Sequence, residues 1–216
     1  MKKMLAMLLA LVMVLSLAAC ASTQPAAEPA ASSDAPAESG KTYTVGVCQL
    51  VQHEALDAAT QGFVDALKEA LGDAVTIDVQ NASGDSVNCG TIVNGFVAKG
   101  VDLIMANATP ALTAAVSATA DIPILGTSIT AYGVALDIDD FSGTVGGNVS
   151  GTSDLADLQK QAQMILDWFP ETKTVGLLFC SAEPNSRYQI DEVRKALEAQ
   201  GVTCEEFAFT DSNDVS

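Results

Sequence analysis

Between residues 43 and 209, short runs of β-forming residues alternate with longer stretches that have helical periodicity. In residues 55–71, for example, apolar side chains recur every three or four positions, which places them on one helical face. Strands that alternate with helices of this length form βαβ units, in which helices cover both faces of a parallel sheet. The sequence therefore predicts an α/β fold. The expected strands are residues 43–50, 75–80, 101–106, 122–126, 148–152, 174–179 and 202–209, and the expected helices are 55–71, a segment capped by Asp85, 110–118, 155–169 and 186–199.

An internal repeat indicates how this fold is divided. Residues 44–47 (TVGV) are echoed by residues 174–177 (TVGL), and further short matches follow in the same order. Ordered matches of this kind predict two similarly built lobes, at residues 43–153 and 154–216. The first copy continues through several more elements, whereas the second stops soon after a strand, where residues 214–216 look like the start of a helix. We therefore expect the second lobe to be truncated in this chain.

The first twenty residues have the layout of an export signal. Lys2 and Lys3 precede an almost entirely apolar run at 4–19, which is shorter than the roughly 20 residues of a membrane-spanning helix. The run ends in the sequence LAAC, which resembles a bacterial lipobox and implies cleavage before Cys20 and lipid modification of that cysteine. An ordinary signal, in which Cys20 is incidental, is the alternative.

The segment that follows predicts a spacer. Residues 21–40 are almost all Ala, Ser, Pro, Glu, Thr and Gln, and this composition buries too little apolar surface to offset the entropy of ordering. We expect a disordered tether at residues 21–42. The predicted location is outside the cytoplasm, either anchored by lipid on Cys20 to the outer face of the bacterial cytoplasmic membrane or periplasmic.

Acidic residues dominate the charge of the chain. Asp and Glu number 27 against 10 Lys and Arg, which gives a formal net charge of -17. Nucleic acid attracts clustered Lys and Arg, so the sequence predicts no nucleic-acid partner. Small molecules or another protein are the expected partners.

Motifs of common enzymes and metal sites are missing from the sequence. A nucleophile elbow fails at Leu155, no phosphate-binding glycine motif is present, and His53 is the only histidine. The four cysteines after the tether lack C-x-x-C spacing, so no metal or cofactor is expected and the chain is predicted not to be an enzyme. We favour buried thiols over disulfides, since free cysteine is among the most buried residue types. Those four cysteines are Cys48, Cys89, Cys180 and Cys204.

Loops at the carboxyl ends of the expected strands are the predicted ligand site, because ligands of parallel α/β sheets lie there. Hydroxyls and helix N-termini in these loops suit a carboxylate, and Glu183 or Asp154 suits an ammonium group. Phe179, Tyr132 or Tyr188 suits an apolar side chain, so the set fits an amino acid. The candidate ligand-binding residues are Gln49, His53, Asn81, Thr109, Ser128, Tyr132, Asp154, Glu183, Asn185 and Ser186.

Several of these residues have a structural alternative. His53 suits a cap for the helix that follows, and Asp154 suits either a hinge or the cap of a helix from Leu155. Thr109 and Ser128 also suit local hydrogen bonds that shape their turns. Glu183, Asn185 and Ser186 lie where helix caps are common.

Residues 45–57 (VGVCQLVQHEALD) resemble the opening of substrate-binding lipoproteins of a bacterial ABC importer family associated with aromatic amino acids such as tryptophan. The resemblance covers the chain from about Tyr43 to the end. It runs through Gln61-Gly62-Phe63, Gln80-Asn81-Ala82, Gly84-Asp85, Asp102-Leu103-Ile104, Ala108-Thr109-Pro110-Ala111, Asp121-Ile122-Pro123, residues 147–154 (GNVSGTSD), Lys173-Thr174-Val175-Gly176 and the loop of Glu183, Asn185 and Ser186.

This resemblance implies a fold and a function. The fold is that of type I periplasmic binding proteins, with two doubly wound parallel-sheet lobes joined by a hinge that close on a ligand. Two departures fall in cleft loops: Glu54 replaces a proline after the histidine, and Ala131-Tyr132 replaces an Asp-Pro. The resemblance therefore leaves the identity of the ligand open.

We expect a solute-binding lipoprotein that captures an aromatic or other amino acid and delivers it to an ABC permease. One alternative is a ligand-sensing or interaction lipoprotein with the same fold, and another is a binding protein for a sugar or nucleoside.

Overall fold

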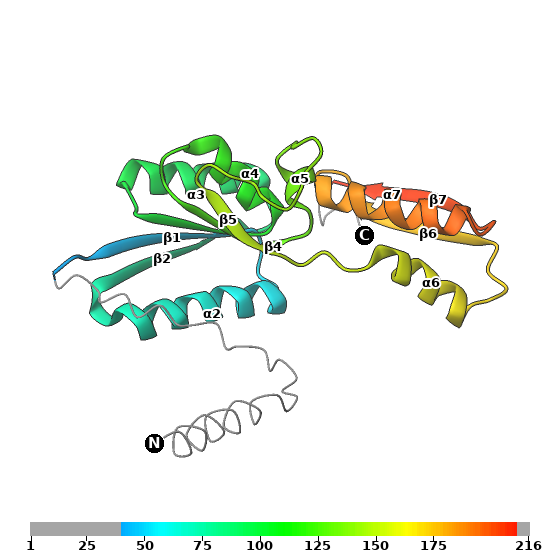
Figure 1. Ribbon diagram of the computed structural model, residues 1–216, viewed down its shortest axis with the longest axis horizontal. Coiled ribbons are helices and arrows are strands. Elements are labelled where there is room, and N and C mark those ends of the chain that lie inside the picture. The colour runs from blue at the N-terminus through cyan, green and yellow to red at the C-terminus, as the bar shows by residue number, and fades with distance from the viewer. Residues whose placement is uncertain (1–39, 211–216) are drawn as a thin grey trace, which may run out of the picture. The chain divides into compact units, whose positions relative to one another are not determined.

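The alternating pattern forms two parallel sheets (Figure 1). The computed structural model describes residues 40–210, which lie within one structural unit, 38–216. The export signal expected at 1–20, most of the expected tether at 21–42 and the expected helix start at 214–216 lie outside the described residues. Among the helices of residues 40–210, none has the length and apolar character needed to cross a membrane.

The first sheet has five strands in the order β2-β1-β3-β4-β5, and every neighbouring pair is parallel. Its strands are β1 (Tyr43–Gln49), β2 (Val75–Asn81), β3 (Leu103–Asn107), β4 (Ile124–Ile129) and β5 (Val149–Ser153). Its helices are α2 (Glu54–Leu71), the 3-10 turn η1 (Gly72–Ala74), α3 (Ser86–Lys99), α4 (Thr109–Ala118) and the short α5 (Tyr132–Ala135). The chain crosses to opposite sides of β1 to form β2 and β3, so the order of the sheet reverses between β1 and β3.

Side chains of β1 alternate between the two faces of this sheet. Val45 and Val47 lie in the cluster formed with α2, while Cys48 lies in the larger cluster formed with α3 and α4. Figure 1 shows α2 on one face and α3 with α4 on the other. Gly46 leaves room for Phe96 of α3, since a Cβ atom at Gly46 would lie 2.5 Å from that ring. The first sheet is therefore covered on both faces, as a parallel sheet requires.

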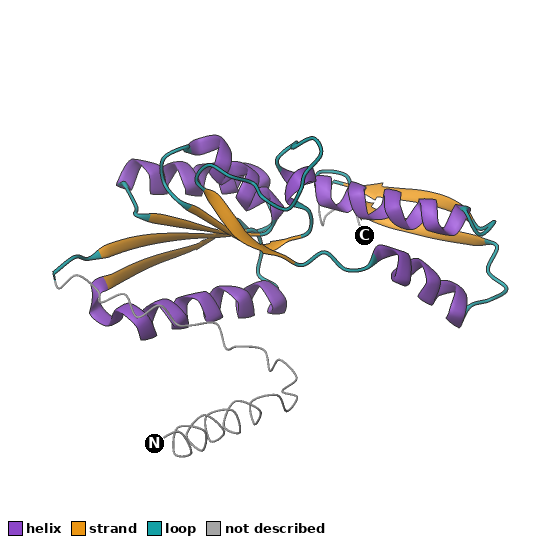
Figure 2. Ribbon diagram, in the orientation of Figure 1, coloured by secondary structure: helices purple, strands orange, loops and turns teal. Residues whose placement is uncertain are grey.

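The second sheet pairs β6 (Thr174–Cys180) with β7 (Thr203–Phe209) in parallel. Helices α6 (Leu158–Trp168) and α7 (Pro184–Glu198) pack together through Ala162 and Leu197, and the strands contribute to the same cluster. Figure 2 draws these helices in purple and the strands in orange. On the other face of these strands, Leu178 is 62% exposed and Phe207 52% exposed. Only one face of the described second sheet is buried.

The predicted α/β alternation is confirmed, with shifts at the ends of elements. Helix α6 begins at Leu158 rather than Leu155, and its cap is Asp157, whose side chain accepts a hydrogen bond of 3.1 Å from the Lys160 N–H. The alternative that Asp154 caps this helix is therefore wrong. The backbone N–H of Asp154 instead donates to the carbonyl of Ile129, which extends the path of β5 alongside β4.

Candidate functional site

A cavity of about 890 Å³ lies at the carboxyl ends of strands from both sheets. The first sheet contributes Leu50 after β1, residues 83–86 after β2 and Pro110 after β3. The second sheet contributes the ends of β6 and β7 and the first turns of α7. Since the strand order reverses between β1 and β3, this is the position at which doubly wound sheets bind ligands.

A buried network of hydrogen bonds fixes the loop after β1. The side chain of Gln49 accepts a hydrogen bond of 2.6 Å from the Thr60 hydroxyl and donates to Asp57 and to the carbonyl of Val51. Asn107, at the end of β3, donates to the Thr60 hydroxyl at 2.9 Å. Val51 lines the cavity, so this network fixes part of the cavity wall. Gln49 itself is buried and committed to these bonds.

His53 lies at the beginning of α2, outside the cavity lining. Its Nδ1 atom accepts a hydrogen bond of 3.2 Å from the Ala55 N–H, which caps the helix. Asn81 behaves similarly after β2, where its side chain accepts from the Ser83 N–H at 2.8 Å. These two predicted residues shape their loops.

The first turn of α4 differs from the first turns of α2, α3 and α6, because no side chain caps it. Ala108 adopts a φ of 91° at the N-cap position, and Pro110 lines the cavity. Thr109 between them is 2% exposed, and its Oγ1 atom has no hydrogen-bond partner within residues 40–210. An uncapped helix start carries exposed N–H donors and the positive end of the helix dipole, which together suit an anionic group.

Glu183 and Ser186 bring polar groups to the cavity from the second sheet. Both line it, and the Ser186 hydroxyl donates to the Glu183 carboxylate at 3.2 Å. Asn185 donates to the same carboxylate at 3.5 Å, while its own Oδ1 atom is buried and without a partner in the described part of the chain. A carboxylate at the cavity wall suits a cationic group such as an ammonium.

Tyr132 belongs to a different region. Its hydroxyl donates to the Gly126 carbonyl at 3.0 Å and to the Thr152 carbonyl at 3.3 Å, and burial raises the pKa of the Tyr132 phenol. Together with Tyr188 it lines a second cavity of about 580 Å³. Ser128 lies at the irregular β4–β5 register with a φ of 56°.

The structure thus gathers only part of the predicted site. Of the predicted residues, Glu183 and Ser186 line the larger cavity, and Tyr132 lines the smaller one. The residues of the set that line neither cavity are Gln49, His53, Asn81, Thr109, Ser128, Asp154 and Asn185.

Apolar side chains of the cavity wall are missing from the predicted set. Leu50, Leu178, Ile190 and Phe209 line the cavity, and Phe179, expected to pack against an apolar group, lines it as well. Leu50, Leu178 and Phe209 lie at or near the ends of strands, which is the signal that could have found them, whereas Ile190 lies within α7. Apolar residues at strand ends have the same pattern as core residues, so polar loop residues were favoured instead.

Four thiols within the described residues are free. Cys48 and Cys89 are buried in one cluster. Hydrogen bonding with the Cys48 thiol lowers the pKa of Cys89, and the same interaction together with burial raises the pKa of Cys48. Cys180 and Cys204 are half-buried, and Cys180 lines the larger cavity, where its thiol donates to the Thr210 carbonyl at 3.5 Å. Among residues 40–210, no group of three or more His, Cys, Asp or Glu side chains is arranged to hold a metal ion.

Comparisons with known proteins identify relatives of this chain. A family model described as ABC transporter substrate binding protein matches residues 44–216. A tyrosine-binding protein of Clostridioides difficile is 34% identical over 185 residues, which cover 83% of this chain and 52% of the relative.

Solved structures of solute-binding proteins are also similar to this chain. The ABC domain from Streptococcus pneumoniae, in complex with L-Trp, is 37% identical with a TM-score of 0.75, over 81% of this chain and 60% of that one. A leucine-binding protein from Thermotoga maritima, 12% identical with a TM-score of 0.60 over 79% of this chain and 49% of that one, shares the fold. These likenesses confirm the predicted type I periplasmic-binding-protein fold. The chain spans about half of the curated relative and three fifths of the tryptophan-bound structure.

Proposed function

The chain belongs to the ABC transporter substrate-binding proteins, and from this premise we propose that it captures an aromatic amino acid and delivers it to a membrane permease. Proteins of this family bind solutes and are not enzymes. The tyrosine-binding and tryptophan-bound relatives support an aromatic ligand. Both departures from the family pattern, at Glu54 and Ala131-Tyr132, fall in cleft loops, so other amino acids are alternative ligands.

One observation carries the proposal most directly: the cavity combines an uncapped helix start, a carboxylate and apolar side chains. Pro110, in the first turn of α4, is part of the cavity wall, so this helix start suits the ligand's carboxylate. The adjacent Thr109 hydroxyl, buried outside the lining and unpaired in the described residues, is proposed as a further donor. Glu183 suits the ammonium group, and Phe179 with Leu50 suits the side chain. A zwitterion with an apolar side chain needs these three chemistries together.

Binding in this proposal works by closure of two lobes, residues 43–153 and 154–216. A ligand that contacts both lobes favours the closed form by its differential affinity for that form. Asp154 lies at the start of the connecting segment, where a hinge is expected. The permease then distinguishes the closed, loaded form from the open one.

We further propose that the protein is exported and anchored through a lipid on Cys20. The short apolar run, the LAAC ending and the polar tether support this location. In this proposal residues 21–40 act as a flexible spacer, which would span on the order of 25 Å and lift the folded part above the membrane surface. Replacing Cys20 by Ala should abolish incorporation of a labelled fatty acid in the producing bacterium, and persistent labelling of C20A would contradict the anchor.

The test of the binding function is a calorimetric titration of the protein from residue 21 onward. Tryptophan, tyrosine, phenylalanine, leucine, ribose and adenosine form a panel that separates the candidate solute classes. We expect saturable binding of the aromatic amino acids. A ligand at 100 times its dissociation constant should also raise the free energy of unfolding by about 2.7 kcal/mol. Selective binding of ribose or adenosine would overturn the ligand class, and binding of none would favour the sensing or interaction function.

A further inference from the structure

A cationic side chain lies against the aromatic ring of the proposed site. The guanidinium carbon of Arg187 is 4.2 Å from the centre of the Phe179 ring. Phe179 lines the larger cavity, whereas Arg187 is not among the residues that line it. Since only Phe179 borders the cavity, Arg187 contacts the ring from outside the space where the ligand is proposed to bind.

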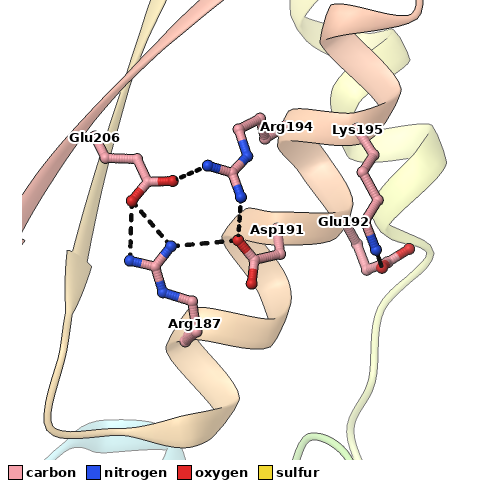
Figure 3. A network of polar contacts seen from close by, with 6 residues as sticks. All are labelled: Arg187, Asp191, Glu192, Arg194, Lys195 and Glu206. Atoms are coloured by element: carbon pink, nitrogen blue, oxygen red, sulfur yellow. Dashed lines mark hydrogen bonds and ion pairs between the residues drawn. The ribbon is translucent and has the colours of Figure 1, made fainter.

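Arg187 is held in place by a network of ion pairs that joins α7 to β7 (Figure 3). Both of its terminal nitrogens donate to one oxygen of Glu206 at 2.9 Å, and one of them also donates to Asp191 at 3.2 Å. Arg194 binds the other oxygen of Glu206 and donates to Asp191 at 2.5 Å. Glu206 raises the pKa of Arg187 above its ordinary value, so the group stays charged.

This network uses every arginine of the chain. Arg187 and Arg194 are the only two in a sequence with 27 Asp and Glu residues. Figure 3 shows both pointing toward Glu206, while Lys195 and Glu192 form a separate pair. Exposed ion pairs add little stability individually, but a planar guanidinium fixed on several sides has one preferred orientation. The network therefore sets where the charge lies relative to the ring.

The ring itself has little freedom. Phe179 is 5% exposed and shares a cluster with Leu177 and Ile190. Phe179 is one of the residues that line the cavity, and Arg187, which contacts its ring, is not. A ligand side chain that reaches this wall therefore meets a ring that already has a cation against it.

We propose that Arg187 is a positioning residue that acts through Phe179 to favour electron-rich aromatic side chains over aliphatic ones in the larger cavity. This inference rests on the proposed function, of which it names the selectivity device. A cation near one face of a ring draws electron density toward itself, which leaves the remaining surface less negative. Indole and phenol rings are electron-rich, so they stack on such a surface better than on a neutral phenylalanine, whereas leucine gains nothing from the charge.

The test compares two charge-removing variants at the same network. Arg187→Met keeps the length of the side chain and removes the charge next to the ring. Arg194→Met removes the other arginine of the same network; in the described residues the cation over the Phe179 ring is Arg187, not Arg194. Calorimetric dissociation constants for tryptophan, tyrosine and leucine are measured for both variants and for the wild type.

For R187M we expect tryptophan and tyrosine binding to weaken about three- to tenfold relative to leucine binding. R194M should change the ratio of these affinities by less than about twofold. Arg187→Lys, which keeps a cation but not the planar fork, should retain part of the preference. Equal weakening of all three ligands in R187M, or the same change in R194M, would overturn the role of Arg187.

A double variant separates selectivity from general loosening of α7. In Phe179→Leu, the added R187M change should no longer alter the ratio of tryptophan to leucine affinity, because the ring that transmits the charge is gone. Phe207→Leu, on the neighbouring strand and outside the cavity lining, is the matched control and should leave the R187M effect intact. A wild type that binds no amino acid would instead contradict the proposed function itself.

Discussion

The ring of Phe96 occupies the space over Gly46 where any other residue would carry its Cβ atom. Gly46 is an interior residue of β1, and Phe96 is a fully buried residue of α3. The absence of a side chain on the strand therefore sets how closely the helix approaches the sheet. Asp85, the N-cap residue of the same helix, lines the cavity, so this packing also supports the cavity wall.

Replacing Gly46 by Ala should destabilise the protein. The new Cβ would lie 2.5 Å from the Phe96 ring, and forcing it in costs about 1–3 kcal/mol of unfolding free energy. Gly62→Ala is the control, since Gly62 is exposed on α2 and a Cβ atom there would have nothing within 4 Å, and it should stabilise the protein by up to about 1 kcal/mol. Urea unfolding of both variants measures the difference, and a neutral G46A would contradict the packing described.

Thr109→Val should separate stability from binding. The buried hydroxyl has no partner in the described residues, so its removal should leave the unliganded protein unchanged or stabilise it by up to about 1 kcal/mol. If the hydroxyl donates to a ligand carboxylate, affinity should fall about tenfold.

Thr113→Val provides the comparison for that variant. Thr113 lies one turn further along α4, and its hydroxyl donates to the Thr109 carbonyl at 2.9 Å. Its replacement should leave amino-acid affinity unchanged in calorimetry. Equal affinities of wild type and T109V would exclude a ligand contact by the Thr109 hydroxyl.

Tyr132→Phe should lower stability by about 1 kcal/mol at neutral pH, because two carbonyls lose their hydroxyl donor. Burial raises the pKa of Tyr132, so the folded protein holds this proton more tightly than the unfolded chain. The stability that it contributes is present below about pH 10 and is lost as pH rises through the folded pKa.

The Tyr132 effect is measured by urea unfolding between about pH 7 and pH 11. The Y132F variant should show a shallower loss of stability above about pH 10 than the wild type. Tyr188→Phe, which removes a phenol from the same smaller cavity, tests whether any tyrosine has this effect. An identical alkaline slope in wild type and Y132F would contradict the assigned role.

Alkylation of cysteines should report on the cavity. Cys180 lines it and is half-buried, whereas Cys48 and Cys89 are fully buried, so iodoacetamide should modify Cys180 well before those two. Bound tryptophan should slow modification of Cys180. Cys204 is half-buried outside the cavity lining, so timed peptide mass spectrometry should show no selective protection there. Equal protection of Cys180 and Cys204 would indicate general stabilisation rather than a ligand in the cavity.

The order of strands and helices could be predicted because each element repeats a short local pattern. The start of α6 could not, since both Asp154 and Asp157 are good caps and the choice depends on a bond from Asp154 to Ile129 in another strand. Helix α5 has only four residues, too few for a periodic signal.

The position of the larger cavity follows the rule for parallel sheets, but most of the residues that line it could not be identified from the sequence. His53 and Asn81 have side chains that suit either a ligand or a local turn, and the structure shows both bonded to nearby backbone. Tyr132 is buried by strands that precede and follow it, which no local pattern indicates. Apolar wall residues such as Leu50 and Phe209 have the pattern of core residues in sequence.

Every neighbouring pair in the five-stranded sheet is parallel, so no strand can pair with the next through a tight turn. Tyr43 pairs with Val75, and Val45 pairs with Leu103, across long intervening segments. Such distant pairings require long loops to close before any ladder forms, which slows folding to roughly milliseconds or longer. A newly made chain therefore remains unfolded for some time, and this delay suits the export that we propose for the protein.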